Sequence, residues 1–296
     1  MYYNDKTIVF LNGKFIRAVD AHAGLFNQTM HYGNGVFEGI RSYKTSNGTR
    51  VFKSKEHFER LLYSAEMMHI KMKYSVNELT DITYQVLEKN NFSDAYIRPL
   101  VYLGENMQLG PVNDVNVFVA AWEWANYLGD KLTRVMLSSY QRPNPKSCHV
   151  EAKVVGHYIN SILATTEAKS KGYDEALLTD MNGHVAEASG ANFFYEKKGK
   201  LFTAPKGNIL MGITRATVLE IAKEEGIEVE ETFFKPEALT DADSAFFCGT
   251  AAEVAGIESI NDRPFRLKWE DSLGRRIQVI YKNLVTGKLE KKINAV

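Results

Sequence analysis

The order of apolar and polar positions divides the chain into two stretches, each of which predicts both strands and helices. The first stretch opens with the runs TIVFL and KFIRAV on either side of Asn12-Gly13, a dipeptide typical of tight hairpin turns. Asn47-Gly48 predicts a second such turn. From Lys55 to Ile70 apolar residues recur at helical spacing instead, so we expect one buried helix face, formed by Phe58, Leu61, Leu62, Ala65 and Met68.

A second helix is expected after Ser75, because Ser75 and Glu78 have the spacing of a capping box. The runs 96–103 and 115–122 then have the composition of strands. These elements predict an antiparallel sheet with two helices over residues 1–125. Residues 126–134 break the pattern and predict an interdomain loop.

Residues 135–296 predict a second domain in which strands and helices are again mixed. We expect a strand near 135–139, a helix after Lys153 that ends near Gly172, and strands joined by turns at Asn182-Gly183 and Lys198-Gly199. A helix capped by Thr214 and ending at Gly226, a strand that ends in the Gly-Thr-Ala turn after Cys248, and a last helix over about 273–284 follow. The predicted class is α+β with two domains.

Composition and charge narrow the function classes. The 296 residues are long for one ordinary domain, and 36 basic residues balance 36 acidic ones, which favours neither nucleic acid nor an anionic membrane as a partner. Two distant cysteines, Cys148 and Cys248, predict neither a disulfide framework nor a metal site. With no apolar run near the roughly 18 residues of a membrane span and no signal-peptide pattern, we expect a cytoplasmic protein.

Lys153 is the first candidate for chemistry. It lies among small apolar residues, with Gly156 and Tyr158 close behind it, and we expect it at the end of a strand. Burial there would disfavour its charged form, and a neutral amine can attack a carbonyl and hold it as a Schiff base. The alternative is an ordinary surface lysine at a junction between a loop and a helix.

Three features of the second domain suit a phosphorylated ring. Gly212–Arg215 opens a helix, whose N-terminal N–H groups favour phosphate. The small residues of Cys248–Ala252 would let backbone N–H groups approach an anion. Glu187 lies in a strand of small apolar residues and could pair with a protonated ring nitrogen. The plainer alternatives are a helix cap, a tight turn and a glutamate that faces water.

The first domain adds aromatic and cationic side chains. Tyr32, Phe37 and Arg41 belong to HYGNGVFEGIR, which predicts a loop or a bulged strand, and Tyr96 and Arg98 belong to AYIRPL. The aromatic residues could be part of a core. The neighbouring arginines fit recognition of a substrate carboxylate better than core packing.

Eight motifs in this order resemble one family: HYGNGVFEGIRSY, VFKSKEHFERL, AYIRPL, ANYLG, EAKVVGHYINS, VAEASGANFF, GITR and CGTAAEV. The chain is similar to the class IV, fold-type IV pyridoxal-phosphate (PLP) aminotransferases, most of all to the branched-chain amino acid aminotransferases. The resemblance implies a small N-terminal domain with an antiparallel sheet and a larger C-terminal pseudo-barrel-like domain with helices.

The resemblance also implies roles for single residues. Lys153 would be the Schiff-base lysine and the proton carrier, Tyr158 would hydrogen-bond the ring oxygen of PLP, and Glu187 would pair with the pyridine nitrogen. The phosphate would be bound by Arg60 and by backbone groups of Ile213, Thr214 and Thr250, and further cofactor contacts would come from Leu210 and Gly249.

For the substrate, the resemblance implies three groups of contacts. The α-carboxylate would be held by Thr250, Ala251 and Tyr96, and the apolar pocket would be formed by Tyr32, Phe37, Gly39 and Tyr127. Arg98, with Arg41 nearby in the pattern, would serve a distal carboxylate. A loop of a partner subunit would complete the pocket, which implies at least a homodimer. The segment GENMQLGPVN matches the family loop only with a shifted register, so either Met107 or Gln108 would occupy the pocket position.

The expected function is transfer of the amino group of leucine, isoleucine or valine to 2-oxoglutarate, which gives branched 2-oxo acids and L-glutamate. A D-amino-acid transaminase, an (R)-amine transaminase or an aminodeoxychorismate lyase of the same fold is the alternative. A non-catalytic protein that retains the fold is disfavoured, because it would have no reason to keep Lys153, Arg60 and Glu187 together.

Overall fold

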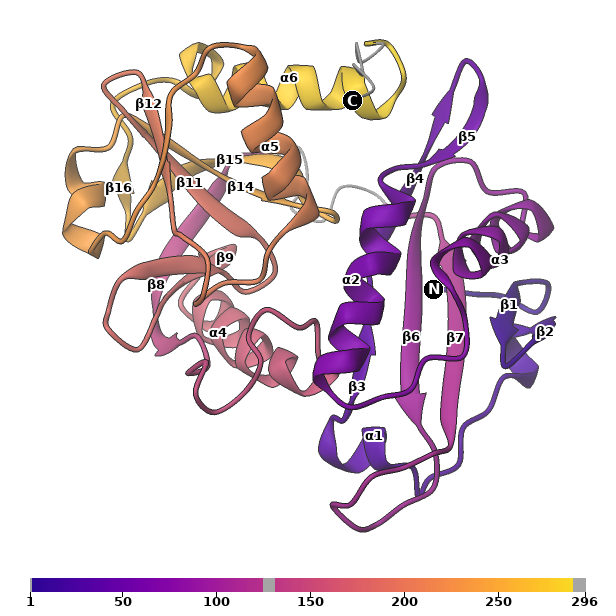
Figure 1. Cartoon of the computed structure of the whole chain (residues 1–296). Helices are drawn as coiled ribbons and strands as arrows, with labels where there is room; N and C mark the ends of the chain where they lie inside the picture. The colour runs from indigo at the N-terminus through magenta and orange to yellow at the C-terminus, as the bar shows by residue number, and fades with distance from the viewer. Residues whose placement is uncertain (1, 125–130, 290–296) are drawn as a thin grey trace. The chain divides into compact units, whose positions relative to one another are not determined.

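The structure is a computed structural model that describes residues 2–124 and 131–289. The chain forms two compact units (Figure 1). Unit 1 contains Met1–Ala125 and Ala152–Tyr158, and unit 2 contains Asn126–Glu151 and Ile159–Val296. The segment with Lys153 therefore belongs with unit 1, although the sequence placed it in the second domain.

Unit 1 is built on an antiparallel sheet in the order β2-β1-β7-β6-β4-β5, with β3 also paired to β6. Along much of β6 and β7, buried and less buried residues alternate, because successive side chains of a strand point to opposite faces of the sheet. The strands are β1 (Ile8–Leu11), β2 (Lys14–Arg17), β3 (Gly35–Phe37), β4 (Ile40–Thr45), β5 (Gly48–Val51), β6 (Ala95–Leu103) and β7 (Val115–Trp122).

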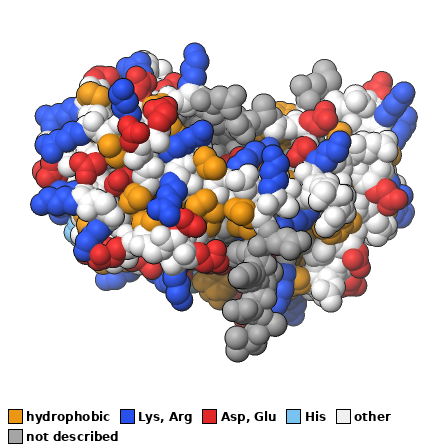
Figure 2. Space-filling model, turned by 90° about the horizontal axis from the view of Figure 1, so that it is seen from above, with side chains coloured by type: hydrophobic (Ala, Val, Ile, Leu, Met, Phe, Trp, Pro, Cys, Tyr) orange, Lys and Arg blue, Asp and Glu red, His pale blue; other side chains and the backbone are white. Residues whose placement is uncertain are grey.

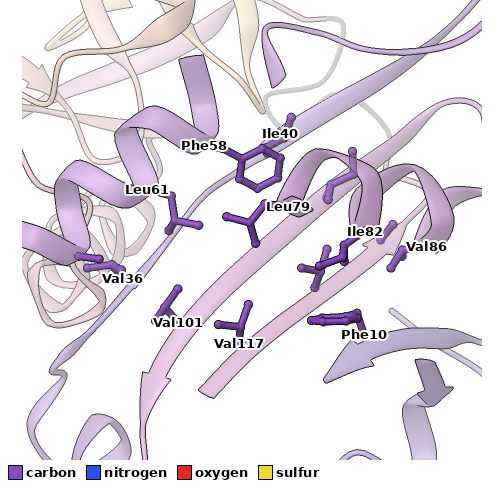
Figure 3. Packing of buried hydrophobic residues seen from close by; sticks show 14 of the residues in the cluster. Phe10, Val36, Ile40, Phe58, Leu61, Leu79, Ile82, Val86, Val101 and Val117 are labelled. Atoms are coloured by element: carbon purple, nitrogen blue, oxygen red, sulfur yellow. The ribbon is translucent and has the colours of Figure 1, made fainter. Parts of the chain in front are cut away.

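Two helices, α2 (Ser54–Met67) and α3 (Val76–Lys89), cover one face of this sheet (Figure 1). Their apolar faces meet the strands in one core, in which Leu61 and Leu79 lie over Val101 and Val117 (Figure 3). Each such buried side chain contributes about 1.5–3 kcal/mol through the hydrophobic effect. Two short helices, η1 (Ala18–Asp20) and α1 (Gln28–Tyr32), complete the unit together with η2 (Val155–His157).

The local signals of unit 1 are confirmed with one exception. Asn12 and Gly13 both have positive φ, 48° and 88°, as a tight hairpin turn requires. Ser75 and Glu78 form the predicted capping box of α3. The second hairpin differs, because Gly48 already pairs with Thr45, so its turn is Ser46-Asn47 and not Asn47-Gly48.

Unit 2 contains a nine-stranded sheet that closes on itself. Its order is β10-β9-β8-β15-β14-β11-β12-β13, and a further pairing of β10 with β11 joins six of the strands into a ring. Each strand of the ring contributes a residue to one buried cluster: Val135, Leu177, Val185, Phe193, Phe247 and Ile257. This closure confirms the expected pseudo-barrel. The strands are β8 (Thr133–Gln141), β9 (Glu175–Thr179), β10 (Val185–Ala188), β11 (Asn192–Lys197), β12 (Lys200–Thr203), β13 (Val229–Glu231), β14 (Ser244–Gly249), β15 (Glu253–Ile260) and β16 (Arg263–Pro264).

Helices surround the barrel strands. Ala164 and Ala168 of α4 pack against β8 and β9, while α5 and α6 pack against each other and against β14 and β15. The helix after Lys153 and the helix after Gly212 both end just before a glycine with positive φ, Gly172 and Gly226, as predicted. The helices are α4 (Tyr158–Ser170), α5 (Ile213–Glu224), α6 (Leu273–Val285), η3 (Pro236–Asp241) and η4 (Trp269–Asp271).

One helix start was predicted wrongly. Gly212 is the N-cap residue of α5 and has no side chain, whereas Thr214 lies inside the first turn and is buried. The sequence pattern favoured Thr214 because threonine is a preferred capping residue. Gly212 takes this position because it lies directly against Asn192, and a Cβ atom there would be 2.0 Å from Asn192 Oδ1.

Basic and acidic side chains are interspersed over the face shown in Figure 2, in keeping with the zero net charge. Within the described residues, no helix is both long and apolar enough to cross a membrane.

We expect Leu61→Ala to reduce the free energy of unfolding by about 2–5 kcal/mol, because it leaves a cavity in the core between α2 and the sheet. Urea unfolding followed by tryptophan fluorescence measures this change. Glu59→Ala is the matched control in the same helix, since Glu59 is exposed and its 3.7 Å contact with Lys55 is a surface pair worth at most about 1 kcal/mol. Equal stability losses in the two variants would contradict the assigned core.

Candidate active site

Lys153 lies in an irregular segment of unit 1, and its main chain is held on both sides. Its N–H donates to Ser64 Oγ of α2 at 3.0 Å, and its carbonyl accepts from Phe37 N of β3 at 3.1 Å. An isolated bridge between Val36 and Val154 extends this contact. The expected strand end is therefore wrong: a single bridge and two hydrogen bonds take the place of a strand.

The Lys153 amine is half-buried among aromatic rings. Nζ donates to the Tyr158 hydroxyl at 2.6 Å and lies 5.0 Å from the Phe37 ring centre and 5.1 Å from that of Tyr158. The two rings touch edge to face, with centroids 4.8 Å apart. Such an amine has one defined polar partner and little room to move, unlike a surface lysine.

Arg60 of α2 is bound by a fully buried carboxylate. Its Nε donates to Glu38 Oε1 at 2.6 Å, and its Nη2 donates to Glu38 Oε2 at 2.8 Å. His57 Nδ1, one turn earlier on the same face of α2, lies 2.7 Å from Glu38 Oε2. Glu38 has no solvent exposure, and the side chain of Arg60 is 12% exposed.

The charges of this cluster are strongly coupled. Burial alone would raise the pKa of Glu38, but the charge of Arg60 and the hydrogen bonds from Arg60 and His57 hold that pKa well below its usual range. Burial lowers the pKa of His57, and this effect exceeds the opposing attraction of Glu38. His57 is therefore neutral at neutral pH, with Nδ1–H donating to the carboxylate.

A third group on unit 1 combines rings with cations. The Arg98 guanidinium lies 4.7 Å from the Phe37 ring centre and 5.3 Å from that of Tyr96, and its Nη2 donates to the Tyr96 hydroxyl at 3.1 Å. Gly39 lies against the same hydroxyl, since a Cβ atom at Gly39 would be 2.1 Å from it. Arg41 pairs with Tyr96 across β4 and β6 and so shares its face of the sheet. Lys153, Phe37 and Arg98 therefore form one continuous region.

Other predicted pocket residues lie elsewhere or outside the described residues. Tyr32, at the end of α1, is exposed and donates its hydroxyl to Met107 O at 3.0 Å. Gln28 Nε2 of the same helix donates to Gln108 O at 2.8 Å. Both Met107 and Gln108 are exposed, so the register of this loop stays a prediction. Tyr127 lies outside the described residues.

Glu187 of β10 is buried in unit 2 and does not face water. Arg142 Nε forms an ion pair with Glu187 Oε1 at 2.9 Å, and Leu210 N donates to the same oxygen at 3.0 Å. Asn192 Nδ2 donates to Glu187 Oε2 at 3.0 Å and to Leu210 O at 2.9 Å. A carboxylate with these donors is fixed in orientation and has a cation beside it.

The unit 2 residues expected around a phosphate lie near Asn192. Asn192 pairs with Glu187 on one side and with Cys248 on the other, so the three residues form one row across β10, β11 and β14. Gly249, Thr250 and Ala251 follow directly after this row, and Gly212 at the start of α5 touches Asn192. The first turn of α5, with Ile213 and Thr214, therefore begins beside the strand ends.

Cys248 itself is a structural residue. Burial raises the pKa of its thiol to about 12, so it stays protonated and unreactive at neutral pH. Among the described residues, no group of three or more His, Cys, Asp and Glu side chains could hold a metal ion.

Comparisons with known proteins show the family to which this chain is similar. A family model described as amino-transferase class IV matches residues 35–260. A curated branched-chain-amino-acid aminotransferase of Pseudomonas aeruginosa is 38% identical over 289 residues, which is 96% of this chain and 94% of that protein. The crystal structure of a branched-chain aminotransferase from Thermoproteus uzoniensis with norvaline has a TM-score of 0.92, 36% identity and 96% coverage of both chains. A T.th. branched-chain amino acid aminotransferase complexed with N-(5'-phosphopyridoxyl)-L-glutamate has a TM-score of 0.90 and 37% identity, and the match covers 96% of this chain and 95% of that one.

The chain belongs to the class IV aminotransferases. The matched region of this class IV aminotransferase includes Lys153, Arg60 and Glu187, while Tyr32 precedes it. The expected fold type is confirmed by the structural matches.

Sequence reasoning missed several residues of this aminotransferase that hold the predicted ones in place: Glu38, Ser64, His57, Arg142 and Asn192. Some signal was available, because Glu38 is a charged residue between two strands and His57 precedes Arg60 by one turn. The only signal for Arg142 was its position in the polar loop QRPNPKS, and no signal in the sequence indicated Ser64.

We expect acid to destabilise unit 1 through His57. Because the pKa of His57 is lowered in the folded state, the unfolded chain binds a proton at a higher pH than the folded chain does. The free energy of unfolding therefore falls as the pH drops below about 6.5. The loss has a limiting slope of about 1.4 kcal/mol per pH unit. Urea unfolding at pH 7, 6 and 5 measures it.

His57→Asn is the control, because its amide can donate to Glu38 without titrating. This variant should show a smaller decline between pH 7 and pH 5 than the original chain. Glu38 adds little slope in this window, since its own contribution is lost mainly below the ordinary glutamate pKa of about 4.3. Identical slopes for the two proteins would contradict a neutral buried His57.

Proposed function

We propose that this chain is a PLP-dependent transaminase that moves the amino group of leucine, isoleucine or valine to 2-oxoglutarate. The observation that carries the proposal is the half-buried Lys153 amine, 2.6 Å from the Tyr158 hydroxyl, in a class IV aminotransferase. The relatives support the substrate class, since the Pseudomonas aeruginosa protein is named as a branched-chain enzyme and the T.th. structure holds a phosphopyridoxyl-glutamate compound. PLP, when bound, supplies the electron sink that weakens the Cα–H bond of an amino acid.

The residues present fit this cofactor. Lys153 Nζ would bind it covalently and then move the proton between Cα and the cofactor carbon, which is general acid–base work for an amine of suitable pKa. Tyr158, already in contact with Nζ, would donate to the ring oxygen and hold the amine in position. Phe37 would exclude water from one side of the amine, since its ring centre is 5.0 Å away.

Glu187 would pair with the protonated ring nitrogen. Arg142, Asn192 and Leu210 N fix its carboxylate, so its orientation is set before a ligand arrives. Leu210, whose carbonyl accepts a hydrogen bond from Asn192 Nδ2, and Gly249, which follows the strand partner of Asn192, would supply further cofactor contacts.

The phosphate would be bound by Arg60 and by backbone N–H groups of Ile213, Thr214 and Thr250. The N-terminus of a helix and a turn of small residues both favour an anion, and an arginine can make two parallel hydrogen bonds to it. The assignment of groups from both units to one cofactor rests on the family resemblance.

The region around Phe37 and Arg98 would receive the substrate side chain. Rings and a guanidinium in one place suit both an apolar side chain and the distal carboxylate of glutamate, which a two-step transaminase must accept in turn. Arg41, Gly39 and Tyr96 border this region, and Tyr96 with Thr250 and Ala251 would hold the α-carboxylate. Tyr32, Tyr127 and the loop with Met107 and Gln108 would complete the apolar pocket.

We expect Lys153→Ala to abolish the visible absorption of the lysine-bound cofactor and to lower turnover of L-leucine with 2-oxoglutarate by about 10³-fold or more, because the proton carrier is lost. Absorption spectra and a coupled assay measure the two effects. Lys71→Ala removes an exposed lysine of the same unit and should retain both colour and turnover.

A panel of L-leucine, D-alanine and an aromatic (R)-amine as donors separates this function from other members of the same fold. Turnover of L-leucine that depends on 2-oxoglutarate is expected. If D-alanine or the (R)-amine is turned over and L-leucine is not, the proposed substrate class is wrong. If the Lys153→Ala variant keeps its colour, the assignment of Lys153 is wrong.

The same proposal includes a homodimer in the cytoplasm. An apolar surface, the α1 patch, consists of Leu25, Phe26, Met30 and Leu109, all strongly exposed. Its two segments are joined by the hydrogen bond from Asn106 N to Phe26 O. Exposed apolar surface of this kind marks interaction sites.

The cytoplasmic location is supported by Cys148 and Cys248, which are both free thiols.

We expect light scattering to give twice the 33.5 kDa mass of the chain at micromolar concentration. Leu109→Asp should raise the dissociation constant of the dimer by about tenfold or more, because it places a charge in the α1 patch. Leu289→Asp alters an exposed leucine outside the patch and serves as the control. A monomeric original chain, or equal effects of both variants, would contradict this interface.

A further inference from the structure

One buried group of charged residues, here called the Glu38 cluster, consists of Glu38, His57 and Arg60. Of the three, only Arg60 has a role in the proposed mechanism. The cluster lies wholly within unit 1, between the β3–β4 connection and α2. Its carboxylate accepts four hydrogen bonds, from Arg60 Nε, Arg60 Nη2, His57 Nδ1 and Gly39 N, over distances of 2.6–3.2 Å. A carboxylate has about four acceptor positions, so this one is close to saturated, and each donor restricts its orientation further.

The main chain on both sides of the cluster is fixed as well. Glu38 N donates to Pro99 O of β6 at 2.9 Å, so the carboxylate is carried by the central strands of the sheet. On the helix side, Ser64 donates to Arg60 O at 2.8 Å and accepts from Lys153 N at 3.0 Å. The backbone that carries Arg60 is thus tied to the backbone that carries Lys153.

The exposure of the three side chains gives the cluster a direction. Glu38 is not exposed and His57 is 2% exposed, whereas 12% of the Arg60 side chain reaches solvent. The carboxylate therefore lies behind the guanidinium, on the side of the core. A guanidinium has five N–H groups, and Glu38 engages two of them through the edge formed by Nε and Nη2. This contact fixes the plane of the group and the direction of its Nη1 edge.

Stabilisation of the fold does not by itself explain a buried ion pair at this position. Replacement of a buried ion pair by apolar residues is often neutral or stabilising, so stability alone gives little reason to place three ionisable groups here. A cation that must meet an anion in one geometry does give such a reason, because a long arginine side chain otherwise loses conformational freedom on binding.

We propose that Glu38, with His57 behind it, is a positioning residue that fixes the Arg60 guanidinium for the phosphate of the cofactor. The inference rests on the proposed function, in which Arg60 binds that phosphate. Two effects of Glu38 oppose each other: its negative charge weakens the attraction between Arg60 and a phosphate, and its two hydrogen bonds orient the guanidinium in advance. We expect orientation to outweigh charge, because loss of the two hydrogen bonds to Glu38 leaves more of the orientation of the guanidinium to be set when the ligand binds.

The test compares two ligands that differ only in the phosphate, PLP and pyridoxal. Their dissociation constants are measured by absorbance and fluorescence titration of cofactor-free protein. Glu38→Gln should weaken PLP binding by about threefold to tenfold, the loss that accompanies the ordering of one long side chain. It should leave pyridoxal binding unchanged, since Glu38 acts only through Arg60. Glu59→Gln, an exposed change in the same helix, should alter neither constant.

A double-mutant cycle tests the route of the effect. Arg60→Gln should remove most of the preference for PLP over pyridoxal, and Glu38→Gln added to it should cause no further loss. If Glu38→Gln does not fold, Glu38→Asp takes its place: it keeps the charge but is too short to reach both Arg60 and His57, and the same loss specific to PLP is expected.

The outcomes separate the inference from the function on which it rests. Equal weakening of both ligands, or no weakening of either, by a folded Glu38 variant would show that the residue is merely structural and would overturn the inference alone. A preference for PLP that survives Arg60→Gln would overturn it too, since Arg60 would not be the phosphate anchor. An original chain that binds neither ligand would remove the proposed function itself.

Discussion

The hydrogen bonds at the peptide of Lys153 are the constraint on which the part of the candidate site in unit 1 depends. The N–H of this residue is bound by Ser64 and its carbonyl by the N–H of Phe37, so a segment distant in sequence is fixed between α2 and β3. Because α2 also carries Arg60, and the β3–β4 connection carries Glu38, the same helix and sheet also fix the ion pair between these two residues. The core between α2, α3 and the sheet keeps that helix in position.

In unit 2 the corresponding constraint is the closure of the barrel. The ring is completed by a single paired position, Glu187 with Asn192, and these two residues are also the polar centre of the candidate site residues in unit 2. A carboxylate and an amide at a seam between strands satisfy each other, and Arg142 supplies the charge that burial of Glu187 requires. The same side chains thus serve both the fold and the site, which explains why glycine must stand at position 212 beside Asn192.

The sequence predicted features that are encoded by a few neighbouring residues, and it failed for features that depend on residues distant in the chain. The hairpin at Asn12-Gly13 and the capping box at Ser75 are encoded within a few residues and were predicted correctly. The cap at Thr214 and the turn at Asn47-Gly48 failed, because tertiary packing at Asn192 and the register of β4 and β5 decided them. The site residues Lys153, Arg60 and Glu187 were named from motifs, and their roles stay predictions, as do the domain boundaries. Ser64 was beyond reach, since its bond to Lys153 joins residues 89 positions apart and no local pattern encodes it.

The distribution of charge has a further consequence. Arg60 and Glu38 neutralise each other within unit 1, and Glu187 and Arg142 do so within unit 2. A buried charge without a partner costs several kcal/mol, so a cation in one unit that relied on an anion in the other would make the folding of each depend on their contact. Here each of the two buried carboxylates has its cation within its own unit, so the orientation of each pair is set inside that unit. The orientation of these two ion pairs before ligand binding is in this sense a property of two separate cores.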